Sequence, residues 1–186
     1  RFRGHRIDGL PPHRVARHGI GRKFQIPGIY PDLPVAENLR VARFSRAGRR
    51  ALLGLGRPPG RWSTEDLLTL VGLGRRRDVA AGNLAHGERQ WLEIAMVVAT
   101  EPALLLLDEP TTGLTEAETL ATVALVRRLH DETGVAAIVI EHDMRFVEAL
   151  DCPVAFMARG RIAREGGIAE IRDDPLVREA YLGRAA

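Results

Sequence analysis

Apolar positions along the chain fall into short continuous runs and into longer segments with helical spacing. Residues 103–107 form an apolar run that Asp108 ends, which is typical of a strand buried on both faces of a parallel sheet. Similar apolar runs predict further strands at 20–25, 135–140, 154–157 and 161–163. Helical spacing and capping residues predict helices at 12–18, at 35–44, from 63 onward, and at 86–100, 116–132 and 143–150.

Turn and capping residues set the boundaries of these elements. Ser63 is a typical helix N-cap, because acidic residues fill the turn that follows it. Gly134 is expected to end the helix that begins near residue 116. Residues 45–61 are rich in Gly, Pro and Arg, and we expect a mobile, solvated connection there. Because strands alternate with helices, the sequence predicts an α/β fold with a mostly parallel sheet.

Composition narrows the class of protein. A chain of 186 residues with 45% hydrophobic residues can form a real core, which argues against disorder. The 27 basic and 24 acidic residues leave a net charge of +3, which suits a protein near phosphates without indicating nucleic acid. Cys152 is the only cysteine, so an intrachain disulfide is excluded and a cytosolic location is expected. No apolar stretch is long enough to span a bilayer. The chain begins at Arg1 without a methionine, which suggests a fragment or an unusual start.

An acidic pair supplies the strongest chemical signal. Asp108 and Glu109 follow the apolar run directly, and ligands of open α/β sheets bind beyond the carboxyl ends of the strands. One carboxylate there can hold a hard cation, while the other orients or deprotonates a water molecule. A pair that only ends a strand would show the same local pattern.

Three weaker signals lie elsewhere. The first is the start of the 86–100 helix, formed by Leu84, Ala85, His86, Gly87 and Glu88. A glycine there lets a phosphate approach free backbone N–H groups. An ordinary turn and helix cap would show the same sequence pattern. His142 follows a predicted buried strand and can donate to a phosphate oxygen, or can be a structural histidine. The Gln25 amide can hold a metal-bound or attacking water, or can be a surface residue.

Taken together and in this order, these segments resemble the motifs of the ATP-binding cassette (ABC) family. Gln25 is similar to the Q-loop glutamine, and residues 84–88 resemble the signature motif. Residues 104–109 resemble the Walker B motif, and His142 resembles the switch histidine. The D-loop would lie at Gly113, Leu114 and Thr115. The resemblance covers essentially the whole chain.

The resemblance implies a fold, cofactors and a mechanism. We expect one partial ABC ATPase domain over residues 1–186, like that of P-loop NTPases, with a helical subdomain at 26–100 and a catalytic core at 101–186. ATP and Mg²⁺ are the implied cofactors, with Asp108 and Gln25 near the metal, Glu109 as general base and His142 near the γ-phosphate. The Q-loop would sense the nucleotide and face a coupling helix of the membrane subunit.

The resemblance also implies partners and a location. Membrane permease subunits and a second ATPase subunit are expected directly, a solute-binding protein indirectly, and nucleic acid is not expected. The protein would lie at the cytoplasmic face of the cell membrane. Within the family, segments 19–25, 37–39, 90–94 and 180–183 resemble importers of branched-chain amino acids and urea. Segments 22–25, 86–87 and 90–91 look most like the urea-importer ATPase.

Several positions depart from the family's pattern. The chain contains no Gly-x-x-x-x-Gly-Lys-Ser/Thr, so it looks truncated before Arg1 and is expected to be inactive alone. Ala85 stands where the signature motif usually has serine, His86 where it has glycine, and Glu88 where it has glutamine. Thr115 replaces the usual D-loop aspartate. Two other functions stay open: a non-catalytic interaction module, and a non-transport relative that acts on nucleic acid or ribosomes.

Overall fold

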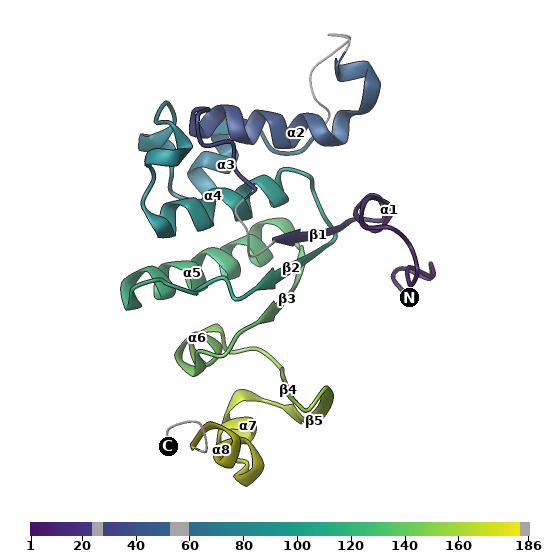
Figure 1. Cartoon of the computed structure of the whole chain (residues 1–186), viewed down its shortest axis with the longest axis vertical. Helices are drawn as coiled ribbons and strands as arrows, with labels where there is room; N and C mark the ends of the chain where they lie inside the picture. The colour runs from purple at the N-terminus through teal and green to yellow at the C-terminus, as the bar shows by residue number, and fades with distance from the viewer. Residues whose placement is uncertain (24–27, 53–59, 183–186) are drawn as a thin grey trace. The chain divides into compact units, whose positions relative to one another are not determined.

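The computed structural model describes residues 1–23, 28–52 and 60–182, which fall into two compact units, Arg1–Ile140 and Glu141–Ala186 (Figure 1). The first unit holds the helices α1 (Pro12–Arg17), α2 (Val35–Leu52), α3 (Thr64–Leu70), α4 (His86–Val98) and α5 (Glu116–Thr133), the short 3-10 turns Gly74–Arg76 and Ala81–Asn83, and the strands β1 (Ile20–Lys23), β2 (Leu104–Asp108) and β3 (Ala136–Ile140). No helix in the described ranges is long and apolar enough to cross a membrane.

A parallel sheet with strand order β1-β2-β3 organises the first unit. Strand β2 is central, with Leu105 opposite Gly21 on one side and Ala137 on the other. Helix α5 connects β2 to β3 and packs against β3, while α4 packs against β1. This arrangement confirms the predicted α/β fold with a parallel sheet.

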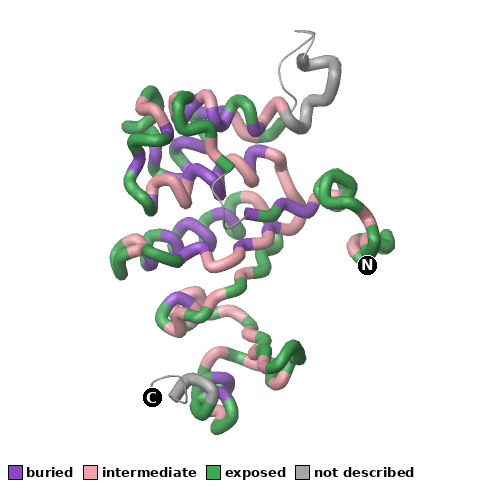
Figure 2. The backbone as a smooth tube through the Cα atoms, in the orientation of Figure 1, coloured by how far each residue is buried: buried purple, intermediate pink, exposed green. Residues whose placement is uncertain are grey.

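Burial is uneven across the sheet (Figure 2). Leu105 and Leu107 of β2 are fully buried, whereas their neighbours on the other face are only half-buried. The prediction that β3 is a buried strand was wrong, because Ile138 and Ile140 are 54% and 61% exposed. Strand β3 lies at the edge of the described sheet and pairs there with β2 alone, so its apolar side chains lack a second neighbouring strand.

Close packing joins β1 to the helical layer above it. A Cβ built on Gly21 would lie 2.5 Å from Val97 Cγ1 and 3.1 Å from Pro102, so only a glycine lets α4 approach this strand. The apolar face of α4 is buried through Leu92, Ile94 and residues near its end. The periodicity that predicted this helix therefore marks a buried face, and α4 packs against both α2 and β1.

Helices α2, α3 and α4 pack on one another in this layer. The prediction of a loose connection from residue 45 was wrong, since α2 continues to Leu52. Its last turns are rich in Ala and Arg, which favour helix, and the single Gly48 does not stop it. The N-cap prediction at Ser63 is confirmed: its side chain accepts from the Asp66 N–H at 3.0 Å, and Asp66 accepts from the Ser63 N–H at 2.8 Å.

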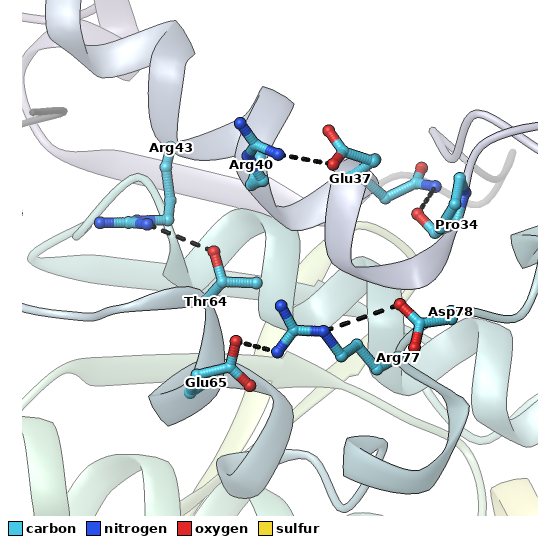
Figure 3. A network of polar contacts seen from close by, with 9 residues as sticks. Pro34, Glu37, Arg40, Arg43, Thr64, Glu65, Arg77 and Asp78 are labelled. Carbon is cyan, nitrogen blue, oxygen red and sulfur yellow. Dashed lines mark hydrogen bonds and ion pairs between the residues drawn. The ribbon is translucent and has the colours of Figure 1, made fainter.

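Polar contacts tie the surface of the layer together (Figure 3). Arg43 of α2 donates to Thr64 Oγ1 of α3 at 3.2 Å, and Arg77 pairs with Glu65. The Asn38 side chain, fully buried, donates to the carbonyls of Tyr30, Leu33 and Pro34. These contacts anchor the segment that follows the undescribed residues 24–27 to the start of α2.

The second unit is a hairpin with three helices. It contains α6 (Met144–Leu150), β4 (Val154–Ala158), β5 (Arg161–Gly166), α7 (Ile168–Asp173) and α8 (Pro175–Leu182). Strands β4 and β5 pair antiparallel, as expected from the short link at Arg159 and Gly160, which both take positive φ. The chain's division into a helical subdomain at 26–100 and a core at 101–186 stays a prediction.

Candidate functional site

The end of β2 places two carboxylates at the edge of the parallel sheet. Asp108 is the last residue of β2 and lies opposite Ile140 of β3. Glu109 follows with φ of +45°, a left-handed conformation that is uncommon for a residue with a side chain. Its N–H donates to the Ile140 carbonyl at 2.9 Å, so the backbone is held in place although the strand has ended. Such local strain is typical of functional positions.

Asp108 is suited to a cation but contacts an arginine in this structure. Arg22 donates from Nη2 to Asp108 Oδ2 at 3.1 Å, across from β1 to β2. Among the described residues, no cluster of three or more His, Cys, Asp and Glu side chains forms a metal site. The role of Asp108 at a Mg²⁺ ion therefore stays a prediction.

A threonine that the sequence analysis missed positions Glu109. Thr112 Oγ1 donates to Glu109 Oε2 at 3.0 Å within the turn after β2. A hydroxyl that donates to a carboxylate fixes the orientation of that carboxylate. The signal that would have found it is a hydroxyl three residues after the acidic pair.

The N-terminus of α4 is built from residues 84–88. Ala85 is the N-cap and makes no side-chain cap, whereas Glu88 Oε2 accepts from the Ala85 N–H at 3.0 Å. Glu88 also pairs with Arg76 at 2.9 Å, while the Leu84 side chain is buried in the core. His86 Nε2 lies 3.1 Å from the Thr112 carbonyl oxygen. Thus the α4 N-terminus and the turn after β2, distant in sequence, meet at this point.

Gly87 brings the same helix end against α5. A Cβ on Gly87 would lie 2.6 Å from Glu118 Oε1. The pKa of Glu118 is lowered, first by the backbone N–H of Thr115, then by the Thr115 hydroxyl, with a smaller contribution from the Gly87 N–H. The Glu118 carboxylate therefore lies between the N-termini of α4 and α5, and helix N-termini favour anions.

The three residues expected in the D-loop lead into α5. Gly113 has φ of +78°, which the turn requires, and Leu114 donates from its N–H to the Thr111 carbonyl at 3.0 Å. Thr115 is the N-cap of α5: its hydroxyl donates to Glu118 Oε2 at 2.8 Å and accepts from the Glu118 N–H at 3.3 Å. Thr115, which replaces the usual D-loop aspartate, therefore caps α5.

The structure does not give the position of the remaining two candidate residues relative to this site. Gln25 lies outside the described residues, so its role stays a prediction. His142 belongs to the second unit, where its N–H donates to Glu141 Oε2 at 3.1 Å. Its role as a switch histidine likewise stays a prediction. The structure brings together the end of β2, the turn of residues 109–115 and the N-terminus of α4.

A buried ion pair joins β1 to α4 near the site, and the sequence analysis did not predict it. Lys23 Nζ of β1 lies 3.5 Å from Glu93 Oε2 of α4, and the two side chains are only 3% and 8% exposed. Burial raises the pKa of Glu93, and the Lys23 ammonium opposes that rise. The pair ties the strand before residues 24–27 to the helix that begins with residues 86–88.

Comparison with known proteins agrees with this geometry. A family model described as "ABC transporter" matches residues 1–112. A second model, described as "Branched-chain amino acid ATP-binding cassette transporter", matches residues 165–186. The first match covers the N-terminus of α4, the end of β2 and the turn after β2 as far as Thr112.

Curated relatives match over nearly the whole chain. The high-affinity branched-chain amino acid transport ATP-binding protein BraF of Pseudomonas aeruginosa is 36% identical, over 100% of this chain and 76% of the relative. LivG of Escherichia coli, with the same description, is 34% identical over 99% of this chain and 75% of its own length. A lipopolysaccharide export ATP-binding protein, LptB of Acidithiobacillus ferridurans, is 32% identical over 95% of this chain and 70% of its own length.

Solved structures give the same answer for the fold. An ATP-binding cassette of an ABC transporter in its ADP conformation aligns with a TM-score of 0.74 and 26% identity, covering 92% of this chain and 71% of that one. A second structure of that cassette aligns with a TM-score of 0.76 and 25% identity, covering 94% and 73%. The chain therefore belongs to the ABC transporter family and has the fold of its ATP-binding cassettes.

Proposed function

We propose that the protein is the ATP-hydrolysing subunit of an ABC importer for branched-chain amino acids. The observation that carries the proposal is Glu109, held by Thr112 at the end of β2 and joined through that turn to the N-terminus of α4. The match of residues 165–186 to the branched-chain amino acid model supports the substrate class. The names of BraF and LivG point to the same substrates.

The site residues divide the chemistry between them. Glu109 accepts a proton from water while the water oxygen bonds to the γ-phosphorus and the bond to the β,γ-bridging oxygen breaks. Asp108 contributes to the Mg²⁺ site, and that ion, bound with ATP, neutralises the charge of the phosphates. The N-terminus of α4 would face a phosphate of a nucleotide held by a second subunit, where the helix dipole favours the negative charge. For the other two candidate residues we keep the roles that the resemblance implies: His142 would contact the γ-phosphate, and Gln25 would sense the nucleotide.

The proposal includes partners and a place in the cell. Permease subunits would bind the ATPase at the cytoplasmic face of the membrane, and a second ATPase subunit would complete the nucleotide sites. A solute-binding protein would take part only through the permease. Nucleic acid has no role in this scheme.

The 186-residue sequence contains no P-loop motif, so we expect its affinity for ATP to be weak. We expect the 186-residue polypeptide alone to bind Mg-ATP poorly and not to hydrolyse it. Isothermal titration of the isolated chain with Mg-ATP measures this affinity. Tight binding or turnover by the isolated chain would overturn this part of the proposal.

Uptake measurements test the transported substrate. A strain that lacks the gene should lose uptake of labelled leucine and regain it with the natural gene, while the Glu109→Gln variant should not restore it. Urea is the second candidate, favoured by the resemblance of segments 22–25, 86–87 and 90–91 to the urea importer. Loss of urea uptake with normal leucine uptake would select urea, and loss of neither would contradict an importer of these two solutes.

A further inference from the structure

A chain of two hydrogen bonds joins the start of α4 to the carboxylate of Glu109. His86 Nε2 lies 3.1 Å from the carbonyl oxygen of Thr112. The hydroxyl of the same Thr112 lies 3.0 Å from Glu109 Oε2. One threonine therefore connects the imidazole on its main-chain side with the carboxylate on its side-chain side.

The direction of each hydrogen bond is fixed by chemistry. A carbonyl oxygen only accepts, so Nε2 of His86 carries the proton and donates to Thr112. An ionised carboxylate also only accepts, so the Thr112 hydroxyl donates to Glu109. Thr112 is therefore held through two groups: its carbonyl oxygen accepts from His86, and its hydroxyl donates to Glu109.

A neighbouring amide adds to this arrangement. Gln90 Nε2 lies 3.5 Å from His86 Nε2, and Gln90 Oε1 is buried without a hydrogen-bond partner among the described groups. Because His86 Nε2 is a donor here, it has no lone pair for the Gln90 NH₂ group. After a half-turn of the amide, its oxygen would share this single N–H with the Thr112 carbonyl, which stays the nearer acceptor at 3.1 Å.

The turn between β2 and α5 is tight enough to transmit a shift. Gly113 has φ of +78°, and a Cβ on it would lie 3.2 Å from His86 Nε2. The Thr112 N–H also donates to the Glu109 carbonyl at 3.3 Å. With Glu109 itself at φ +45°, little slack separates the imidazole from the carboxylate.

We propose that His86 is a positioning residue for Glu109 and acts through Thr112. The helix end does not need the imidazole, because Glu88 already accepts from the Ala85 N–H and supplies its capping bond. His86 instead links the helix end that faces a phosphate with the base that activates water. The inference rests on the proposed ATPase function, and it assigns a role to the histidine that replaces the usual signature glycine.

Steady-state kinetics of the natural protein with its partner subunits test this role. His86→Ala should lower kcat about tenfold to a hundredfold, the scale of a small misplacement of a catalytic group, and change KM for ATP less than about threefold. His86→Gln keeps an N–H donor and should restore kcat to within about threefold of the natural protein. Thr112→Val, which removes the hydroxyl, should resemble His86→Ala.

His130→Gln is the matched control. His130 Nδ1 lies 3.0 Å from the Val135 carbonyl, a similar bond at the far end of α5. This variant should keep the natural kcat. Equal losses of kcat in His130→Gln and His86→Ala, or a natural kcat in His86→Ala, would overturn the inference. If the unaltered protein hydrolyses no ATP, the proposed function fails instead.

Nitrogen NMR of the histidine rings tests the contact without any activity. At a pH where the imidazoles are neutral, His86 should show the Nε2–H tautomer and His130 the Nδ1–H tautomer, since each faces a carbonyl through that nitrogen. Thr112 and Glu109 amide signals should shift in His86→Ala and return in His86→Gln, with circular dichroism unchanged. An Nδ1–H tautomer at His86, or no shift at Thr112, would overturn the inference.

Discussion

Replacing Lys23 by methionine removes one charge from the buried pair between β1 and α4. The Lys23 and Glu93 side chains are 3% and 8% exposed, and their charged atoms are 3.5 Å apart. Methionine keeps the length and apolar stem of lysine but cannot pair with Glu93. The variant therefore leaves a buried carboxylate without its counter-charge.

The size of the loss follows from the distance and burial. At an effective dielectric constant of about 20, two charges 3.5 Å apart attract by about 4.7 kcal/mol. Breaking a buried pair by removing one partner typically costs about 3–5 kcal/mol. We expect Lys23→Met to lower the free energy of unfolding of the first unit by about 3–5 kcal/mol at pH 8. Adding Glu93→Gln should recover most of that loss.

Urea unfolding followed by tryptophan fluorescence measures the effect. Trp62 and Trp91 are the only tryptophans, and both lie in the first unit, so the signal reports on the unit that holds the pair. Arg6→Met is the control, because the Arg6–Asp8 pair is exposed and should matter by less than about 1 kcal/mol. Equal small losses in Lys23→Met and Arg6→Met would refute the reasoning.

The pH dependence gives an independent check. Burial raises the pKa of Glu93 in the folded state, so its favourable contribution is complete below the unfolded pKa and declines as pH rises through the folded pKa. Lys23→Met removes the nearby charge that opposes this rise and extends the decline to higher pH. The cost of Lys23→Met should therefore be smaller at pH 5 than at pH 8. A cost that does not vary with pH would mean that Glu93 stays neutral in both proteins.

Further predictions concern packing and capping. Gly21→Ala places a Cβ 2.5 Å from Val97 Cγ1 and should cost about 1–3 kcal/mol by urea unfolding, whereas Gly74→Ala meets nothing within 4 Å and should cost less. Thr115→Ala removes the N-cap of α5 and should cost about 1 kcal/mol in the same assay. The Thr115 N–H and then the Thr115 hydroxyl lower the pKa of Glu118, whose contribution is present above the unfolded pKa and lost as pH falls through the folded pKa. Thr115→Ala keeps the N–H and loses the hydroxyl. The acid unfolding midpoint of Thr115→Ala should therefore move to higher pH.

The sequence predicted the parts of the fold that local chemistry determines. The apolar run before Asp108 is the central strand β2, and Gly134 ends α5 with φ of +68°, as its position indicated. Ser63 caps α3 through a reciprocal bond with Asp66. In each case one or two residues and their spacing decide the local conformation.

Long-range packing was harder to predict. Residues 45–52 were predicted to belong to a loop because Gly and Pro are frequent from residue 45 to residue 61. In the structure these residues continue α2 to Leu52, in line with the helix propensity of Ala and Arg. Strand β3 was expected to be buried, yet burial depends on neighbouring strands, and β3 lies at the edge of the described sheet. An apolar run alone does not reveal which neighbours a strand will have.

In the candidate site, too, the local segments were predicted and their long-range contacts were not. The acidic pair and the start of α4 were found as separate segments, because each has its own local pattern. Their meeting through His86 and Thr112, 26 positions apart, depends on how α4 packs beside the turn after β2. The Thr112 hydroxyl and the Lys23–Glu93 pair were missed for the same reason. Only the tertiary fold brings these residues together.

ATP hydrolysis by Glu109→Gln tests the central claim most directly. The natural protein, assembled with its partner subunits, should bind ATP equally well with either residue, because the amide has nearly the shape of the carboxylate. Hydrolysis by Glu109→Gln should fall at least about a hundredfold, since the amide accepts no proton from water. A rate within about threefold of the natural protein would contradict the assignment of Glu109 as the base.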